Sequence, residues 1–402
     1  MEKIKLSERI SKVSPSLTLA ITAKAKAMIE AGEDVVPFGA GEPDFPTPRH
    51  IAEAAKRALD EGHTKYTPSA GLPQLRREIC RKLKEENNLE YDPSQIIVSN
   101  GAKQSVFNAC FALLNDGDEA IIPAPYWLTY PETVKLCGGV PVILPARSEN
   151  GFKITAEELE SAITPKTKLL IFNSPCNPTG AVYSEKEIRE IAAVCVRRGV
   201  FVLSDEIYEK LVYGGVKHFS IASVSEEMKN LTVTVNGVSK TYAMTGFRIG
   251  YLAAPKDIAA AIDSFQSHAT SNACTISQYA AIEALSSPGE EVQKMTDIFA
   301  RRRNALLKAA EKIKGAQCVR PDGAFYAMLN IGGAFGRSVN GKMIRDSADF
   351  CAALLEEKKV AAIPGKGFGA DEYIRLSYTL SEEKIEKGMA RIGEFFESAL
   401  RG

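Results

Sequence analysis

Two basic residues within 235–251 have the types and spacing needed for covalent and phosphate chemistry. Lys240 follows an alternating apolar run that predicts a buried strand, and Arg248 opens a second apolar run eight residues later. An amine at the end of a buried strand can form an imine with an aldehyde, and a nearby guanidinium can hold a phosphate by paired hydrogen bonds. A lone loop lysine is usually a solvated surface residue, so this interpretation depends on the residues that accompany Lys240.

The elements that must position these residues alternate between strand and helix patterns from about residue 50 to residue 285. The expected strands are 95–99, 119–122, 140–144, 169–172, 200–204, 231–235 and 248–253, and the expected helices include 103–114, 131–136, 184–198 and 257–265. Nearly continuous apolar strands separated by helices indicate an α/β fold with a mostly parallel seven-stranded sheet covered on both faces. Ligands bind such sheets at the carboxyl ends of the strands.

The pattern changes after about residue 286. A long charged helix is expected over 290–314, followed by short strands at 317–320, 324–329, 361–364 and 373–377 with helices between and after them. This pattern is typical of a smaller α+β domain. We therefore predict an N-terminal segment, 1–45, that packs with the C-terminal part, a large domain of 46–285 and a small domain of 286–402.

Side chains suited to ligand binding follow the first two predicted strands. Gly101 precedes a predicted helix and would let backbone N–H groups at the helix start face a phosphate, although an ordinary strand–turn–helix also explains it. Trp127 is the only tryptophan of the chain. Its flat face could stack on an aromatic cofactor, whereas the alternative is a core aromatic residue.

Three further candidates follow the next two strands. Asn177 begins the rigid turn Asn-Pro-Thr-Gly, which aims its amide toward the end of the sheet. Asp205 follows an apolar run, so we expect it to be at least partly buried and to need a cationic or hydrogen-bonded partner, such as a protonated pyridine nitrogen. Tyr208 could reach the phenolic oxygen of the same ring. The alternative for Asp205 is a helix N-cap.

Together these groups match the needs of pyridoxal 5'-phosphate: an imine lysine, a carboxylate for the pyridine nitrogen, a stacking ring, donors to the ring oxygen and a phosphate cradle. The chain resembles the fold-type I pyridoxal-phosphate enzymes, and within them the class I aminotransferases of the bacterial aspartate or aspartate/prephenate subgroup. The resemblance covers essentially the whole length, and its strongest motifs are Ala40-Gly-Glu-Pro-Asp-Phe45, Lys65-Tyr-Thr-Pro-Ser-Ala-Gly71, Ser174-Pro-Cys-Asn-Pro-Thr-Gly180, Ser204-Asp-Glu-Ile-Tyr208, Ser239-Lys-Thr-Tyr-Ala-Met-Thr-Gly-Phe-Arg248 and Tyr373-Ile-Arg-Leu-Ser377.

The resemblance implies a function for each residue around the cofactor ring. Lys240 would hold the cofactor as an imine and then transfer the α-proton of the substrate. Asp205 would hold the pyridine nitrogen, Asn177 and Tyr208 would contact the ring oxygen, and Trp127 would stack on the ring.

The resemblance also implies how the phosphate and the substrate are held. Gly101, Ala102, Lys103, Ser239 and Arg248 would surround the phosphate. Tyr66 would reach the phosphate of a neighbouring subunit, which implies a homodimer with shared active sites. Arg375 would clamp the substrate α-carboxylate beside the Gly41 backbone, with Trp127 and Asn177 nearby. Gly237 departs from the family, which often has a serine there, so we expect Ser239 and Arg248 to contribute more to phosphate binding.

The implied reaction moves the amino group of L-aspartate to 2-oxoglutarate by a ping-pong mechanism and yields oxaloacetate and L-glutamate. A dicarboxylic substrate needs a second cation, for which Lys103 is the candidate, and a solvated first-turn lysine is the alternative. Prephenate, aromatic or alanine substrates, and a pyridoxal-phosphate lyase, remain open alternatives.

Composition excludes several other classes of function. The 402 residues are 45% hydrophobic and 25% charged, and 50 basic side chains balance 50 acidic ones, which gives no reason to expect nucleic acid or a membrane as partner. No secretory signal is visible, and the eight scattered cysteines favour a reduced cytoplasmic protein without a metal site. Gly39-Ala-Gly41 begins like a dinucleotide loop, but Pro43 breaks the helix that a dehydrogenase needs. A transcriptional regulator on this fold is disfavoured because no basic extension precedes the aminotransferase-like pattern.

Overall fold

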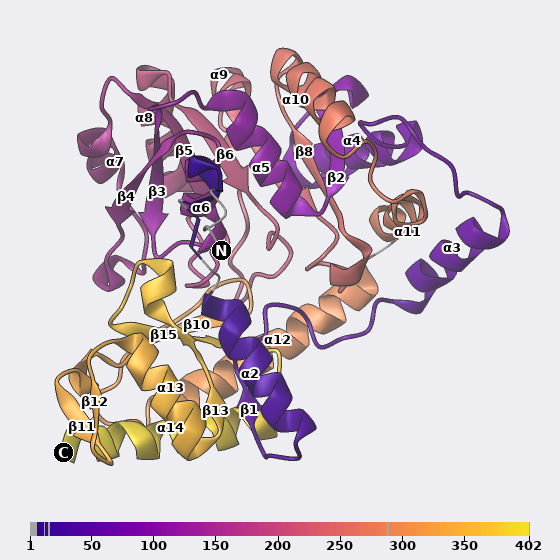
Figure 1. The fold of residues 1–402 in the computed structure, drawn as a ribbon. Coiled ribbons are helices and arrows are strands. Elements are labelled where there is room, and N and C mark those ends of the chain that lie inside the picture. Colours follow the sequence, from indigo (N-terminus) through magenta and orange to yellow (C-terminus); the bar gives the residue numbers. More distant parts are fainter. Residues whose placement is uncertain (1–5, 12, 15–16, 288, 402) are drawn as a thin grey trace.

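A seven-stranded sheet is the largest sheet of the computed structural model, which describes residues 6–11, 13–14, 17–287 and 289–401 (Figure 1). The strand order is β2 (Ile96–Asn100), β8 (Ile249–Ala253), β7 (Thr232–Gly237), β6 (Phe201–Asp205), β5 (Thr167–Asn173), β3 (Glu119–Ala124) and β4 (Val140–Pro145). β8 is antiparallel to both neighbours, and the other pairs are parallel. The predicted α/β class and mostly parallel sheet are therefore confirmed, with each strand end within about two residues of its predicted position.

Helices cover both faces of this sheet because successive strand residues point to opposite sides. Leu169 and Ile171 of β5 join one core cluster, whereas Leu170 and Phe172 join another. The first face packs against α5 (Ala102–Leu113), α6 (Thr129–Leu136) and α10 (Lys256–Ala269). The second face packs against α7 (Ala156–Ala162), α8 (Glu185–Arg198) and α9 (Glu226–Asn230). Where β2 and β8 form this second face, it packs against α3 (Arg49–Asp60), α4 (Pro73–Asn87) and α11 (Thr275–Ser286). Burial on both faces explains why these strands are nearly continuous apolar runs.

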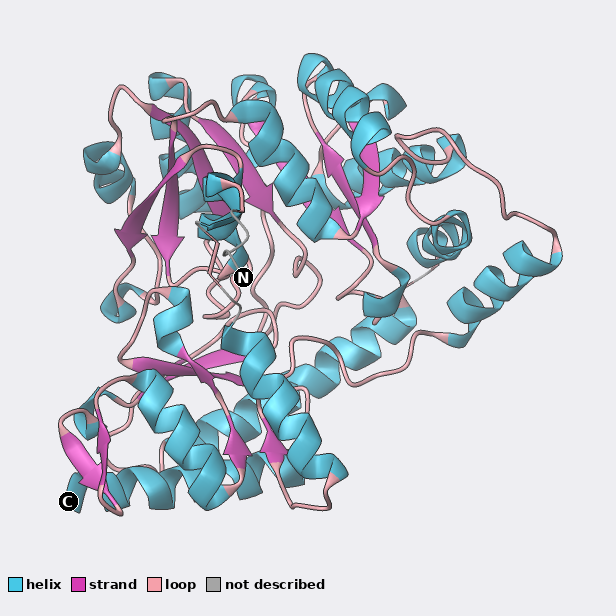
Figure 2. Cartoon of the chain, in the orientation of Figure 1, coloured by secondary structure: helices cyan, strands magenta, loops and turns pink. Residues whose placement is uncertain are grey.

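A smaller antiparallel sheet lies in the C-terminal part of the chain (Figure 2). Its order is β14 (Ile363–Pro364), β15 (Tyr373–Ser377), β10 (Tyr326–Asn330) and β9 (Cys318–Val319), and it packs with α12 (Glu290–Ala310), α13 (Ser347–Lys358) and α14 (Glu382–Arg401). The hairpin of β11 (Arg337–Val339) and β12 (Lys342–Ile344) was not predicted from the sequence. Its turn is Asn340-Gly341, a pair that favours two-residue hairpin turns and could have revealed it.

The N-terminal segment contains α1 (Glu8–Ser11), α2 (Leu17–Glu30) and β1 (Val36–Pro37). β1 pairs in parallel with β13 (Val360–Ala361), and Ala25 and Val35 share a buried cluster with Leu355 and Ala361. The division of the chain at residues 45 and 285 stays a prediction. Among the described helices, none combines the length and the apolar composition needed to cross a bilayer.

Candidate active site

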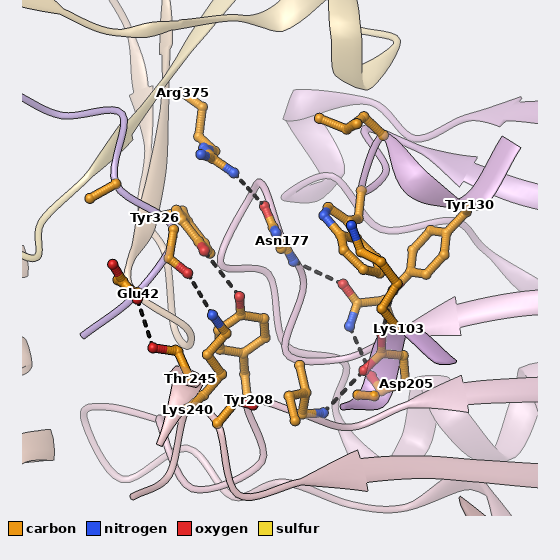
Figure 3. Close-up of a pocket in the computed structure, with 18 of the residues that line it drawn as sticks. Glu42, Lys103, Tyr130, Asn177, Asp205, Tyr208, Lys240, Thr245, Tyr326 and Arg375 are labelled. Atoms are coloured by element: carbon orange, nitrogen blue, oxygen red, sulfur yellow. Dashed lines mark hydrogen bonds between the residues drawn. The ribbon is translucent and has the colours of Figure 1, made fainter. Parts of the chain in front are cut away.

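A cavity of about 450 Å³ lies at the carboxyl ends of β5, β6 and β7, where the N-terminal segment and the smaller sheet close over them (Figure 3). All but two of the predicted site residues line it: Gly41, Ala102, Lys103, Trp127, Asn177, Asp205, Tyr208, Ser239, Lys240, Arg248 and Arg375. The chain thus brings residues from more than 330 positions apart to one cavity, as expected at strand ends of an α/β sheet.

Lys240 lies in the loop that follows β7 and faces the cavity. Its Nζ donates a hydrogen bond of 2.5 Å to the carbonyl oxygen of Gly41. Burial lowers the pKa of Lys240 to about 8, with Arg375 and Arg248 acting in the same direction and Glu42 opposing them. A substantial fraction of this amine is therefore neutral near physiological pH, which is the form that attacks a carbonyl carbon.

Asp205 ends β6 at the floor of the cavity and is only 3% exposed. Its carboxylate accepts hydrogen bonds from Tyr130 Oη at 2.8 Å and from the Ile207 backbone N–H at 3.2 Å. Burial raises the pKa of Asp205 to about 6, although both hydrogen bonds lower it in part. No helix begins at this residue, so the alternative reading of Asp205 as a helix N-cap is wrong.

Arg375 lies in the middle of β15 and is 4% exposed. It donates to Asn177 Oδ1 at 3.0 Å and to the Gly39 carbonyl oxygen at 3.3 Å, and its Nε has no partner among the described residues. Burial lowers the pKa of Arg375, and no described carboxylate lies within ion-pair distance. A buried cation with only neutral partners is suited to bind a carboxylate from outside the chain.

An anion cradle lies where α5 begins. Gly101 precedes the helix with φ of 82°, and no side chain caps the first backbone N–H groups. The positive φ at Gly101 favours glycine, and a Cβ there would also displace the Arg248 guanidinium; a Cβ at Gly250 would collide with the Ala102 backbone, so that position needs glycine. Free N–H groups at a helix start, with Arg248 and Ser239 beside them, form a site for a phosphate.

Gly237 ends β7 against the neighbouring strand. A Cβ there would lie 2.9 Å from the Ile249 carbonyl oxygen and 3.0 Å from Gly250 Cα. A serine at this position would therefore not fit without a shift of the backbone.

Lys103 and Tyr66 differ in their relation to the cavity. The Lys103 Nζ lies 4.9 Å from the centre of the Trp127 ring at the cavity wall, and burial lowers the pKa of Lys103, as does Arg248. Tyr66 does not line the cavity and is 90% exposed in the single chain. Its predicted function needs a second subunit and stays a prediction.

Four further side chains that line the cavity were not predicted from the sequence: Tyr130, Tyr326, Thr245 and Glu42. Tyr130 donates to Asp205, Tyr326 shares a hydrogen bond of 3.0 Å with Tyr208, and Thr245 donates to Glu42 at 2.6 Å. Tyr130 could have been noticed as a polar aromatic residue three positions after Trp127. The others become neighbours only through contacts between distant segments.

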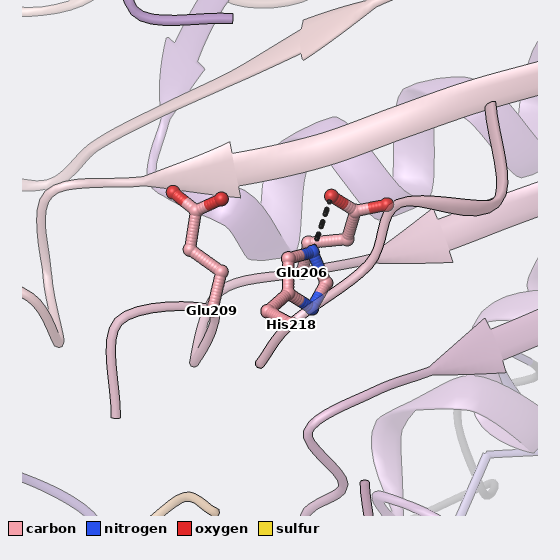
Figure 4. A group of neighbouring side chains, drawn as sticks. All are labelled: Glu206, Glu209 and His218. Atoms are coloured by element: carbon pink, nitrogen blue, oxygen red, sulfur yellow. Dashed lines mark hydrogen bonds and ion pairs between the residues drawn. The ribbon is translucent and has the colours of Figure 1, made fainter. Parts of the chain in front are cut away.

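A second cluster of ionisable groups, none of which lines the cavity, contains Glu206, Glu209 and His218 (Figure 4). Their ligand atoms lie within 4.8 Å of one another, as in a metal site. However, Glu206 pairs with His218 at 3.0 Å, and Glu209 pairs with the buried ammonium of Lys82. Burial would raise the pKa of Glu209, but Lys82 and His218 lower it to about 2, so this carboxylate already has its counter-charge.

The family profile "Aminotransferase class I and II" matches residues 33–392. This chain belongs to that family. The aminotransferase is 51% identical over 395 residues to an aspartate aminotransferase of Geobacillus stearothermophilus, which spans 98% of this chain and 100% of the relative. It is 49% identical to a probable aspartate/prephenate aminotransferase of Aquifex aeolicus, over 98% of each chain.

Solved structures agree on the fold. The aspartate aminotransferase of Rhizobium meliloti matches the aminotransferase with a TM-score of 0.94 and 43% identity, covering 98% of this chain and 99% of the other. The Thermus thermophilus aspartate aminotransferase with maleate matches with a TM-score of 0.92 and 41% identity, covering 97% and 99%. The fold-type I assignment made from the resemblance is confirmed.

Enzymes of this family use pyridoxal 5'-phosphate, and the cavity of this aminotransferase fits the cofactor. It contains an amine held mostly away from solvent, a buried carboxylate with room for a cation beside it, and a helix start whose glycines leave backbone N–H groups open. The donor set therefore agrees with an aldehyde, a protonated ring nitrogen and a phosphate on one molecule.

Proposed function

We propose that this aminotransferase moves the amino group of L-aspartate to 2-oxoglutarate, forming oxaloacetate and L-glutamate in two half-reactions on one site. Four cations line the cavity and form no ion pair with a described residue: Lys103, Lys240, Arg248 and Arg375. The observation that carries the proposal is that Arg375 and Lys103 remain for the substrate when Lys240 is assigned to the imine and Arg248 to the phosphate. Two cations on different elements suit the two carboxylates of a C4 or C5 substrate. The names of the relatives from Geobacillus and Rhizobium support the same substrate.

The chain holds the cofactor through groups that differ in charge. Asp205 would hold the protonated ring nitrogen, with Tyr130 keeping its carboxylate in place. The N–H groups at Gly101, Ala102 and Lys103, together with Ser239 and Arg248, would bind the phosphate. Tyr208 and Asn177 would contact the ring oxygen, and Trp127 would cover the ring. Bound in this way, the cofactor supplies an electron sink for negative charge at the substrate α-carbon.

Positioning of the substrate would come from Arg375. A guanidinium grips a carboxylate through two parallel hydrogen bonds, and this fixes the direction of the α-carbon to hydrogen bond. Lys240 then takes the α-proton on Nζ, because its lowered pKa leaves the amine free to act as a base near neutral pH. Lys240 would then return that proton from the same Nζ to the bound cofactor. Addition of water would release the 2-oxo acid and leave the amino group on the cofactor, which distinguishes this reaction from decarboxylation.

Two further features belong to the proposal. Tyr66 would contribute to the phosphate site of a neighbouring copy, so the enzyme would work as a homodimer with shared active sites, and its high exposure in the single chain supports this. All eight cysteines are free thiols, which supports a reducing compartment and hence a cytoplasmic location.

The test is an end-point assay with the holoenzyme, L-aspartate and 2-oxoglutarate. We expect one oxaloacetate for each L-glutamate and no ammonia. Ammonia release would indicate a lyase. Amino transfer from aromatic amino acids or alanine, but not from aspartate, would show that the amino donor is another amino acid. Prephenate is a second acceptor to include, because relatives from Aquifex aeolicus and Cereibacter sphaeroides carry the aspartate/prephenate name.

A further inference from the structure

Tyr326 contacts both Tyr208, which is proposed to bind the cofactor, and Arg375, which is proposed to bind the substrate. It begins β10, is 1% exposed, and its Oη lies 3.0 Å from the Oη of Tyr208 (Figure 3). The centre of its ring lies 4.4 Å from Cζ of Arg375. β10 and β15 pair with Met328 opposite Arg375, so Tyr326 is the diagonal neighbour of Arg375 on the same face of the small sheet.

The hydrogen bond between the two phenols can run in only one direction when Tyr208 donates into the cavity. Burial raises the pKa of Tyr208 well above its ordinary value and raises that of Tyr326 as well, so both hydroxyls carry their proton at neutral pH. Each phenol has one proton to give. If Tyr208 donates into the cavity, Tyr326 must donate to Tyr208.

We propose that Tyr326 is a positioning residue that acts through two neighbours: its hydroxyl directs the Tyr208 proton toward the ring oxygen of the bound cofactor, and its ring supports the Arg375 guanidinium. This inference rests on the functions proposed above for Tyr208 and Arg375. It assigns to one side chain of the small sheet a contact with the cofactor half of the site and a contact with the substrate half.

The hydroxyl and the ring have separable effects. A phenol that accepts a hydrogen bond becomes a better donor, so Tyr326 strengthens the contact of Tyr208 with negative charge on the ring oxygen. Loss of the hydrogen bond from Tyr326 leaves more negative charge on the ring oxygen of the cofactor. A proton held next to that oxygen is then bound more tightly, so the pH at which the cofactor loses it rises. The face of the ring, by contrast, acts on Arg375, whose other partners are a neutral amide, a backbone carbonyl and the more distant Phe368 ring, 5.0 Å from Cζ.

The experiment compares Tyr326→Phe with Tyr326→Leu in the holoenzyme. Two quantities are measured: the pH midpoint of the visible band of the bound cofactor, and the dissociation constant of maleate, an unreactive dicarboxylate. Tyr326→Phe should raise the midpoint by roughly half a pH unit and leave maleate binding within about twofold. Tyr326→Leu should raise the midpoint similarly and weaken maleate roughly fivefold.

Two controls separate positioning from a general loss of structure. Tyr378→Phe removes another buried hydroxyl of the same core, one that donates to the Ala324 carbonyl at 3.2 Å and does not line the cavity, and it should leave the midpoint unchanged. Tyr208→Phe should raise the midpoint further than Tyr326→Phe does. The double variant Tyr208→Phe with Tyr326→Phe should match Tyr208→Phe alone, because the Tyr326 hydroxyl acts through Tyr208.

The proposal is overturned if Tyr326→Phe leaves the midpoint at the wild-type value, or if its shift adds in full to that of Tyr208→Phe. Equal maleate binding by the Phe and Leu variants would remove the assigned support of Arg375. Because the titration needs no substrate, its outcome does not depend on whether L-aspartate is the amino donor. The comparison of the Phe and Leu variants needs only that maleate binds the wild type measurably. Failure of aspartate transfer in the wild type would reject only the proposed reaction.

Discussion

Tyr130 donates a 2.8 Å hydrogen bond to Oδ2 of Asp205, and both side chains are buried at the floor of the cavity. This contact partly offsets the burial that raises the pKa of Asp205 to about 6. The carboxylate is therefore ionised near neutral pH but has no cation of the chain in ion-pair contact. Such a group destabilises the empty protein and strengthens the binding of a cationic ring.

Asp205→Asn should stabilise the cofactor-free enzyme. Between pH 3.8 and about 6 the folded carboxyl holds its proton more tightly than the unfolded one, so wild-type stability falls as pH rises through this window. The variant avoids this loss, and urea unfolding at pH 8 should give a gain of roughly 2–3 kcal/mol. The gain should fade at pH 4. If the variant and the wild type had equal free energies of unfolding at pH 8 as well as at pH 4, the burial of an ionised Asp205 would be contradicted.

Tyr130→Phe should make cofactor binding more sensitive to acid. Loss of the donated hydrogen bond raises the pKa of Asp205 by about one unit, so less of the carboxylate is ionised at pH 6. The ratio of cofactor affinities at pH 8 and pH 6 should grow about three- to tenfold over the wild type. Tyr183→Phe, which removes a buried hydroxyl that accepts from the Ile154 backbone N–H, is the matched control and should keep the wild-type ratio.

The lowered pKa of Lys240 can be measured in the cofactor-free enzyme. Only the neutral amine reacts with an acylating reagent, so the labelling rate of Lys240, followed by mass spectrometry, reports its titration. We expect a midpoint near pH 8, the value to which burial lowers its pKa. A midpoint near the ordinary lysine value of 10.5 would mean that Lys240 is solvated and not prepared for chemistry.

Lys103→Ala tests which carboxylate this lysine binds. If Lys103 binds the distal carboxylate, KM for L-aspartate should rise about tenfold, on the scale of one charge-assisted hydrogen bond, while KM for L-alanine changes little. Arg375→Ala is the comparison and should weaken both amino acids. An equal effect of Lys103→Ala on aspartate and alanine would assign Lys103 to the phosphate instead.

The large sheet and much of the cavity could be predicted from the sequence for a physical reason. Strands buried on both faces are long apolar runs. A polar residue at the end of such a strand, as with Asp205, or within a few residues after it, as with Lys240, lies at the sheet end where ligands bind. These signals are local, so a single sequence contains them.

Contacts between distant segments could not be predicted in the same way. Tyr208 and Tyr326 are 118 positions apart, and Thr245 and Glu42 are 203 apart. Nothing in either local pattern specifies the partner, because each pairing depends on how the small sheet and the N-terminal segment close over the strand ends. The free Arg375 Nε likewise follows only from the packing around β15.

The most direct test of the proposed reaction is the visible spectrum of the purified holoenzyme before and after addition of L-aspartate without any 2-oxo acid. The wild type should show the band of the lysine-bound cofactor and lose it on addition of aspartate, since the amino group passes to the cofactor. Lys240→Ala should still bind the cofactor but show no such loss at the wild-type rate. A wild-type band that aspartate leaves unchanged would contradict the proposed reaction.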